Sequence, residues 1–469
     1  MLASSANGVG AGRQRPALHF VPPHGWMNDP NGLVVVDGRY HLYYQHNPDA
    51  PEWGNIHWGH AWSEDLLEWH HEPIALAPDE LGMVFSGSAV RDDEGVSGFP
   101  PGSVVAMFTY DRDGLQTQAL AHSSDGGTTW EKFDANPVLA PEPPPGHFRD
   151  PKLIRYTAAD GVQWWVSLIT ADRDIQVFTS PDLKDWSLAS TLTPHIDETD
   201  YMVEVPELVR LPSDDGTEVW TLFVSVTIFG PDKRTRRPVV WSAGTFDGRT
   251  FTPEGTDALP TYLPKSDGYA LQVWEHAESP TAILWMDESD TQPVTGFDWC
   301  GRMSLPQRLR LAGPPGDRRL IGTAVAFDHL LNSGDPIPMQ PPDSVRLVDR
   351  SPRSSLLVRR SSSERPETAI LLRPADGSGR RVAVHLNGTE ATVSVVEGGQ
   401  QRRIDSIDLG GWDEAQVLLD AGSLDLLVDD RVVRYSAVLP LGPEPIDVEV
   451  GQVAGTIDLV VSSLSDGRP

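Results

Sequence analysis

A repeat of about 60 residues in the first two thirds of the chain is the feature that most limits how it can fold. One mark of the repeat is a polar turn followed by an aromatic residue, and successive aromatic residues lie 61, 56 and 65 positions apart. The four copies are Ser63–Trp69, Ser124–Trp130, Ser180–Trp186 and Phe246–Phe251. The segments between them are short, rich in Val, Tyr, Trp and Phe, and bounded by turns, which is typical of strands. Few stretches have a helical period, so the chain is predicted to be all-β.

A second mark of the repeat is a polar stretch that opens each unit, again about every 60 residues. The five stretches are Asn28–Pro30, Ser86–Ser88, Arg149–Pro151, Glu204–Pro206 and Asp267–Tyr269. Five units predict a five-bladed β-propeller of four-stranded blades, because one blade cannot bury both faces and must stack on neighbours around an axis. The innermost strand of each blade lines the central channel. The acids that open three of the units, Asp29, Asp150 and Glu204, should therefore converge on one axial pocket.

The sequence changes in character after Leu311. Residues 312–344 are rich in Pro and Gly and are predicted to form a linker, so the propeller is expected to span residues 19–311. From residue 345 to 469 apolar and polar residues alternate between polar turns, which predicts a β-sandwich that acts as a supporting or sugar-binding module. Residues 1–18 are rich in Gly, Ser and Ala and are expected to be a flexible leader.

Composition excludes several kinds of partner. Lys and Arg number 37 against 67 Asp and Glu, and the net charge of −30 argues against nucleic acid and anionic membrane surfaces. The sequence has no run of about 18 apolar residues, so no transmembrane helix is expected. The single cysteine, Cys300, allows neither an intrachain disulfide nor a cysteine-based zinc site. One cysteine and no secretory signal favour the cytoplasm, with secretion left open if a signal has been removed; the oligomeric state stays undecided.

Three carboxylates around one pocket among aromatic residues suit glycoside hydrolysis. That reaction needs a nucleophile or base, a proton donor, and stabilisation of an oxocarbenium-like transition state. Taken singly, an aspartate before proline, such as Asp29 or Asp150, is more often a turn-former. The region also contains histidines that could suggest a metal site, but no helix sets a ligand spacing, so we interpret them as hydrogen-bonded structural residues. They are His41, His46, His57, His60, His70 and His71.

Six motifs in order make the sequence resemble glycoside hydrolase family 32, the β-fructofuranosidases that include invertases, inulinases and levanases. The resemblance extends over about the first 310 residues. The family is known to fold as a five-bladed propeller, in agreement with the repeat. The motifs are Trp26–Gly32, Tyr40–Pro48, Trp53–His60, Phe85–Ala89, Phe148–Lys152 and Glu204–Glu207.

The resemblance implies a role for each acid. Asp29 matches the nucleophile that forms a covalent ester with the fructosyl unit, and Glu204 matches the general acid/base. Asp150 matches the transition-state stabiliser, and Arg149 is expected to contact the substrate and the acid/base. Further residues match the fructose site, although Trp53 and Phe85 could instead be core aromatics. They are Asn28, Gln45, Trp53, Phe85 and Ser86, with Asp267, Tyr269 and Trp285 as less secure matches.

The acid/base motif departs from the family pattern Trp-Glu-Cys-Pro-Asp. Here Val203 replaces the tryptophan, Val205 the cysteine and Glu207 the aspartate. We expect the changes at Val205 and Glu207 to affect the pKa of Glu204 or the site of the leaving group.

The resemblance favours a retaining exo-β-fructofuranosidase that needs no metal or organic cofactor. Its expected substrate is sucrose, with short fructans as further candidates, and the order of sucrose, inulin, levan and phosphorylated sucrose stays open. One alternative is a fructosyltransferase that uses the same ester, which Asn28 disfavours. Another is a fructan-binding protein without activity, although all three acids are present. A related propeller enzyme acting on arabinan or xylan is disfavoured by the run Trp26–Gly32.

Overall fold

The computed structural model describes residues 15–141, 146–230, 235–255, 261–263, 267–287, 298–350, 353–361, 366–374, 379–439 and 446–464. The chain divides into two compact units. One comprises Phe20–Asp290 and Asp298–Ala326, and the other comprises Met1–His19, Thr291–Phe297 and Phe327–Pro469. None of the helical segments in these described ranges is long and apolar enough to cross a membrane.

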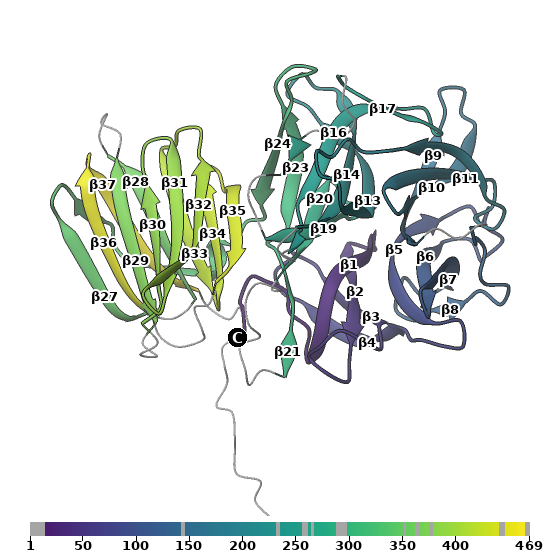
Figure 1. The fold of residues 1–469 in the computed structure, drawn as a ribbon, viewed down its shortest axis with the longest axis horizontal. Helices are drawn as coiled ribbons and strands as arrows, with labels where there is room; N and C mark the ends of the chain where they lie inside the picture. The colour runs from purple at the N-terminus through teal and green to yellow at the C-terminus, as the bar shows by residue number, and fades with distance from the viewer. Residues whose placement is uncertain are drawn as a thin grey trace, which may run out of the picture. The chain divides into compact units, whose positions relative to one another are not determined.

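The described part of the first unit contains five sheets built mainly from antiparallel strands, most of which are labelled in Figure 1. The first contains β1 (Gly25–Val36), β2 (Arg39–Asn47), β3 (His57–Ser63) and β4 (His70–Leu76), with β21 (Trp299–Cys300) parallel to β1. The second contains β5 (Met83–Asp92), β6 (Ser103–Arg112), β7 (Leu115–Ser123) and β8 (Glu131–Lys132). The third contains β9 (Phe148–Thr157), β10 (Gln163–Ala171), β11 (Asp174–Ser180) and β12 (Ser187–Leu192).

The remaining two sheets complete this unit. The fourth contains β13 (Tyr201–Pro212), β14 (Glu218–Phe229), β16 (Val239–Phe246) and β17 (Phe251–Pro253), with β15 (Thr235–Arg236) on β14 and β18 (Thr261–Tyr262) on β16. The fifth contains β19 (Gly268–Val273), β20 (Thr281–Met286), β23 (Gln307–Ala312) and β24 (Arg319–Ala324), with β22 (Arg302–Met303) on β20.

The first strands of the five sheets form a closed ring. β1 contacts β5, β5 contacts β9, β9 contacts β13, β13 contacts β19, and β19 contacts β1. Apolar side chains fill the space between successive sheets; Val34 and Trp58, for example, pack with Phe108 of the next sheet. The unit is therefore the predicted five-bladed propeller, in which each blade buries both faces against its neighbours.

The repeated turn joins the third and fourth strands in four of the blades, and its aspartate explains why the motif recurs. The side chains of Asp65, Asp125, Asp182 and Asp247 each accept hydrogen bonds from backbone N–H groups two to four residues later, at 2.7 to 3.1 Å. An aspartate in this position closes the turn by hydrogen-bonding its own backbone.

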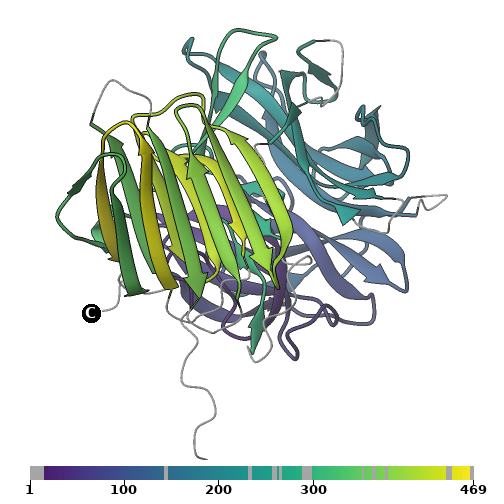
Figure 2. The ribbon, with the colours of Figure 1, turned by 60° about the vertical axis from the view of Figure 1, so that its left-hand side comes forward.

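The second unit is a β-sandwich, whose strands run from green to yellow in Figure 2. One sheet contains β27 (Ser344–Arg350), β36 (Ile446–Ala454), β29 (Glu367–Pro374), β30 (Arg381–Leu386), β31 (Glu390–Glu397) and β32 (Gln400–Asp408). The other contains β35 (Val432–Val438), β34 (Ser423–Val428), β33 (Glu414–Asp420), β28 (Arg353–Arg360), β37 (Ile457–Leu464) and β25 (Leu331–Ser333), with β26 (Ile337–Met339) on β37. A 3₁₀ helix spans Asp328–Leu330.

Alternate residues of the facing strands form the core of the sandwich. Val382 and Val384 of β30 pack in one cluster with Leu356 and Val358 of β28. This alternation matches the period of two expected where one face of each sheet is buried. Residues 312–344, predicted to be a linker, instead contain β24 of the propeller and β25 and β26 of the sandwich. β24 pairs with β23, and β25 and β26 both pair with β37.

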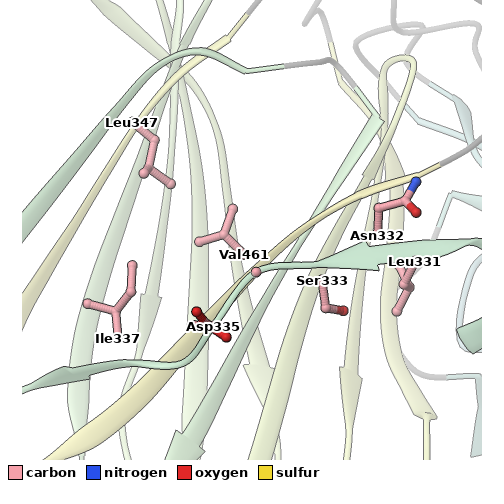
Figure 3. Close-up of a pocket in the computed structure, with 8 residues that line it drawn as sticks. Leu331, Asn332, Ser333, Asp335, Ile337, Leu347 and Val461 are labelled. Atoms are coloured by element: carbon pink, nitrogen blue, oxygen red, sulfur yellow. The ribbon is translucent and has the colours of Figure 1, made fainter.

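An open groove of about 690 Å³ lies in the sandwich, between β25 and β26 and the side chains of Leu347 and Val461 (Figure 3). Its polar lining includes Asn332, Ser333 and Asp335. None of the three predicted catalytic acids lines it.

The start of the described chain is attached to the sandwich through Asp420. Its carboxylate accepts hydrogen bonds from the backbone N–H groups of Ala17, Leu18 and His19 at 2.7, 2.8 and 3.1 Å. The His19 ring lies between two carboxylates, with Nδ1 2.8 Å from Asp420 Oδ2 and Nε2 3.2 Å from Asp425 Oδ2. Residues 1–14 of the predicted leader lie outside the described residues. Ala17 and Leu18 do not belong to a flexible segment, because their N–H groups are held by Asp420.

We expect the His19 contact to make the stability of the sandwich depend on pH. Burial opposes the charge of the ring, but Asp425 and Asp420 outweigh this effect and raise the pKa of His19 from 6.5 to about 9. The stabilisation, about 3 kcal/mol at about 1.4 kcal/mol per pH unit, is therefore complete below pH 6.5 and lost as the pH rises through 9. Urea unfolding should find His19→Gln less stable than the wild type at pH 6 and similar at pH 10. A deficit that is the same at both pH values would contradict this.

Candidate active site

A β-bulge occurs at the same place in the innermost strand of every blade. In each case three steps along this strand oppose two steps along its partner; Glu204, for example, pairs with Ser225, and Glu207 pairs with Phe223. The bulged segments are Met27–Pro30, Val84–Gly87, Arg149–Lys152, Glu204–Glu207 and Tyr269–Gln272. A bulge bends its strand and changes the direction of a side chain. Five bulges around one ring can therefore direct side chains toward a common centre.

Hydrogen bonds join these segments around the three predicted acids. Ser86 Oγ donates to Asp29 Oδ2 at 2.7 Å, which joins β5 to β1. The backbone N–H of Val205 donates to Asp150 Oδ2 at 3.1 Å, which joins β13 to β9. The hydroxyl of Tyr269, on β19, donates to Glu204 Oε2. The site thus takes residues from all five blades.

Three of the bulges place a residue other than glycine in the left-handed region. Asp150 has φ 63°, Val205 has φ 46° and Ala270 has φ 55°. Such a conformation is rare for a β-branched residue and persists only where surrounding contacts hold it. Here the Val205 N–H to Asp150 hydrogen bond provides one such contact.

Three donors surround the carboxylate of Glu204. Arg149 Nη2 lies 2.6 Å from Oε1, Thr227 Oγ1 lies 2.8 Å from Oε2, and the Tyr269 hydroxyl also donates to Oε2. Burial by itself would raise the pKa of Glu204, but Arg149, Tyr269 and Thr227 together lower it. This arrangement favours the ionised form of Glu204.

Arg149 is itself held from several sides. Its Nη1 lies 2.8 Å from His147 Nδ1, its Nη2 contacts Met202 Sδ at 3.6 Å, and its Nε lies 3.7 Å from Asp150 Oδ2. The guanidinium therefore lies between two of the acids and provides the positive charge of the site.

The pKa values of the other two acids are raised. Burial, with a contribution from the negative charge of Asp150, raises the pKa of Asp29 to about 8, although the Ser86 hydrogen bond opposes this. Burial also raises the pKa of Asp150 to about 6, against the effect of Arg149. Three carboxylates facing one arginine can hold a proton near neutral pH.

The other residues expected to bind fructose differ in their surroundings. Gln45 is buried and donates to the carbonyl of Val84 at 3.0 Å. Within the described residues, the Oδ1 atom of Asn28 is buried without a hydrogen-bond partner. Trp53 is 59% exposed, so it is not a core residue, and its ring lies edge-on to that of Phe85 at 6.4 Å.

Of the three less secure matches, Tyr269 donates to Glu204 and Trp285 packs beside Tyr269. Trp285 pairs with Tyr269 across β19 and β20, and the two rings are 6.3 Å apart in an edge-on arrangement. It also packs with Val205 and thus supports the acid/base bulge. Asp267 precedes β19, and its carbonyl accepts a hydrogen bond from the N–H of Asp287 at 2.7 Å.

Sequence reasoning missed three residues of the site. Thr227 contacts Glu204, Thr109 Oγ1 accepts a hydrogen bond from the N–H of Asp150 at 3.1 Å, and His147 contacts Arg149. Thr227 and Thr109 lie on second strands of their blades. A threonine within a buried apolar strand was the one signal available for them.

The histidines that raised the question of a metal site lie in blade 1. His41, His46 and His60 are buried, and burial lowers the pKa of each, to about 4 for His41 and His46 and to about 3 for His60. His41 Nδ1 lies 3.0 Å from His60 Nε2. Among the residues with described positions, no group of three or more His, Cys, Asp or Glu side chains could hold a metal ion.

The model of the glycosyl hydrolases family 32 N-terminal domain matches residues 19–322, well over half of the chain. The chain belongs to glycoside hydrolase family 32. Similar family members include a levanase of Bacillus subtilis, 36% identical over 320 residues that cover 66% of this chain and 47% of the levanase. An extracellular exo-inulinase of Aspergillus awamori is 38% identical over 340 residues, covering 63% of this chain and 62% of the relative. The chain thus spans about half to three fifths of these relatives.

Solved structures of this family extend the similarity to both units. The exo-inulinase of Aspergillus awamori has a TM-score of 0.81 at 25% identity, covering 96% of this chain and 98% of that chain. A family 32 β-fructofuranosidase of Bombyx mori has a TM-score of 0.78 at 25% identity, covering 96% and 94%. The name of the exo-inulinase calls that relative extracellular, which gives no support to the cytoplasmic localisation expected from the sequence.

Proposed function

We propose that this family 32 protein is a retaining exo-β-fructofuranosidase that hydrolyses terminal β-D-fructosyl units of sucrose and of short fructans. The observation that carries the proposal is the convergence of Asp29, Asp150 and Glu204 from three blades, with Arg149 and Tyr269 on Glu204. Relatives named levanase, exo-inulinase and invertase support a β-fructosyl substrate.

Asp29 and Asp150 each have one part in the reaction, and Glu204 has two. Asp29 attacks the anomeric carbon, the bond from this carbon to the leaving oxygen breaks, and Glu204 transfers its proton to that oxygen. A covalent fructosyl ester on Asp29 results. Glu204, now ionised, then takes a proton from a water molecule that attacks the same carbon and releases Asp29. Asp150 accepts hydrogen bonds from fructose hydroxyls and stabilises the positive charge that develops on the ring.

The reaction requires a proton on Glu204 and a charge on Asp29, the reverse of what the pKa shifts favour. We infer that substrate binding reverses this order. Sugar hydroxyls that donate to Asp29 and Asp150 stabilise their ionised forms, and the proton then moves to Glu204. The free enzyme and the substrate complex should therefore have different pH profiles.

Tyr269→Phe should move the alkaline limb of kcat, which follows Glu204 in the substrate complex, to higher pH by about one unit. The Tyr269 hydroxyl helps lower the pKa of Glu204, so its loss raises that pKa and keeps Glu204 protonated at higher pH. Initial rates on sucrose between pH 4 and pH 9 measure the limb. Thr227→Val removes the second donor to the same oxygen and should move it in the same direction. A limb that stays in place, or moves down, in both variants would contradict the role of Glu204 as the acid.

Time-resolved proton NMR of the protein with concentrated sucrose tests the proposed function. Early appearance of glucose and β-fructofuranose, before the ring forms equilibrate, is the expected result. Glucose in excess of free fructose, with new oligosaccharide signals, would show that transfer to sugar acceptors dominates. No change with sucrose, inulin or levan would overturn the proposal and favour a binding protein without activity.

A further inference from the structure

In three of the bulged segments the last residue has a buried polar side chain that takes no part in the proposed chemistry. These residues are Lys152, Glu207 and Gln272, which occupy equivalent register positions in β9, β13 and β19. Their exposed fractions are 3%, 0% and 4%. Lys152 lies two residues after Asp150, and Glu207 lies three residues after Glu204.

An ion triad connects the first two of these residues, Lys152 and Glu207, with Glu275. Lys152 Nζ lies 2.9 Å from Glu207 Oε1 and 2.7 Å from Glu275 Oε1. The second oxygen of Glu207 accepts the backbone N–H of Val273 at 3.1 Å, and the N–H of Glu275 donates to the carbonyl of Leu33 at 3.0 Å. One buried cation therefore links the blades that carry Asp29, Asp150, Glu204 and Tyr269.

We propose that the triad Lys152–Glu207–Glu275 is a positioning element that holds Asp150 and Glu204 at their working separation. This inference rests on the roles given to Asp150 and Glu204 in the proposed function. None of the three residues needs to touch the substrate. The triad acts through the bulges, because its Lys152–Glu207 ion pair joins the last residue of the bulge that contains Asp150 to the last residue of the bulge that contains Glu204.

Proline makes each connection short and stiff. Pro151 separates Asp150 from Lys152, and Pro206 precedes Glu207. The ring of proline fixes φ, so a shift at Lys152 or Glu207 is carried to the acid instead of being absorbed between them. Catalytic groups misplaced by about 1 Å can cost about 10²-fold in rate.

Stability alone does not account for ions at this position. A buried ion pair is weak evidence for stability, because an apolar pair of similar volume is often as stable or more so. What an ion triad adds is a defined distance between three blades. The departure of Glu207 from the family pattern thus concerns the support of the site, since Glu207 contacts Lys152 and not the Glu204 carboxylate.

The test compares Glu207→Gln and Glu207→Asp in the wild type and in an Asp150→Asn background, using glucose release from sucrose. Glu207→Gln removes the charge at nearly constant size, and Glu207→Asp keeps the charge. Glu254→Gln is the matched control, because Glu254 forms a partly buried ion pair with Arg318 at 3.0 Å in the same unit, away from the bulges. Near-ultraviolet circular dichroism gives the folded fraction to which each rate is normalised.

We expect Glu207→Gln to lower kcat about 10- to 100-fold and to change KM by less than about threefold, whereas Glu207→Asp recovers most of kcat. In the Asp150→Asn background, Glu207→Gln should lower kcat by less than about twofold, because the effects of substitutions at residues that act as a unit are not additive. The control should stay within about twofold of the wild type.

Two results would overturn the inference while leaving the proposed function intact. One is the same fold loss for Glu207→Gln in both backgrounds, and the other is a Glu207→Asp variant as slow as Glu207→Gln. If Asp150→Asn alone keeps the wild-type kcat, the role of Asp150 in the proposed function fails, and the separation that the triad is proposed to hold has no catalytic meaning.

Discussion

Asp29→Asn should hydrolyse sucrose at least about 10³-fold more slowly than the wild type in kcat. An amide of nearly the same size keeps the contact with Ser86 but cannot form the fructosyl ester. The loss therefore falls on the chemical step, and KM should change little. Steady-state glucose release measures the rate. Mass spectrometry of acid-quenched wild-type protein should also detect one added hexosyl unit that Asp29→Asn does not acquire.

Ser86→Ala is the control for this prediction, because it removes the hydrogen bond to Asp29 Oδ2 at 2.7 Å and keeps the carboxylate. Its loss should be far smaller, about 10-fold, and it should still form the adduct. A folded Asp29→Asn protein with near-normal turnover would remove Asp29 from the role of nucleophile.

Glu204→Gln should also lose at least about 10³-fold in kcat on sucrose, because it removes both the proton donor and the base that activates water. The size of the loss should depend on the leaving group. The phenolate of an aryl β-fructofuranoside leaves with little help from an acid, so Glu204→Gln should slow ester formation from this substrate much less than from sucrose. Azide needs no base to attack, and should therefore accelerate turnover of the aryl substrate by the variant.

Arg149→Lys gives a comparison for Glu204→Gln, because it alters the ion pair at 2.6 Å but leaves the acid in place. Azide should not accelerate its turnover. If azide fails to accelerate turnover by Glu204→Gln, or if the variant loses kcat by the same factor on sucrose and on the aryl substrate, the acid/base must be sought among other residues.

The fold could be predicted because its signals are local and repeated. Asp65 and its three counterparts close the same turn in four blades, and the five polar stretches that open the units give the number of blades. Asp29, Asp150 and Glu204 could be proposed from motifs because each lies within two residues of a proline in a distinctive run. The linker prediction was wrong because Pro and Gly in residues 312–344 bound short strands instead of interrupting them.

The order of the pKa values of the three acids could not be predicted in the same way. It depends on which donors face each carboxylate, and Thr227 and Tyr269 reach Glu204 from other strands, 23 and 65 residues away in the chain. The same holds for Lys152, which no motif marks as the partner of Glu207 and Glu275.

The sequence by itself determined the all-β fold, the number of blades and the sandwich, since turn chemistry and strand alternation act over a few residues, and its motifs supplied the three acids proposed for the site. Only the tertiary structure decided which acid favours its proton, which residues hold Arg149, and how the five bulges meet at one centre. These depend on burial and on contacts between distant strands, which exist once the ring of blades has closed.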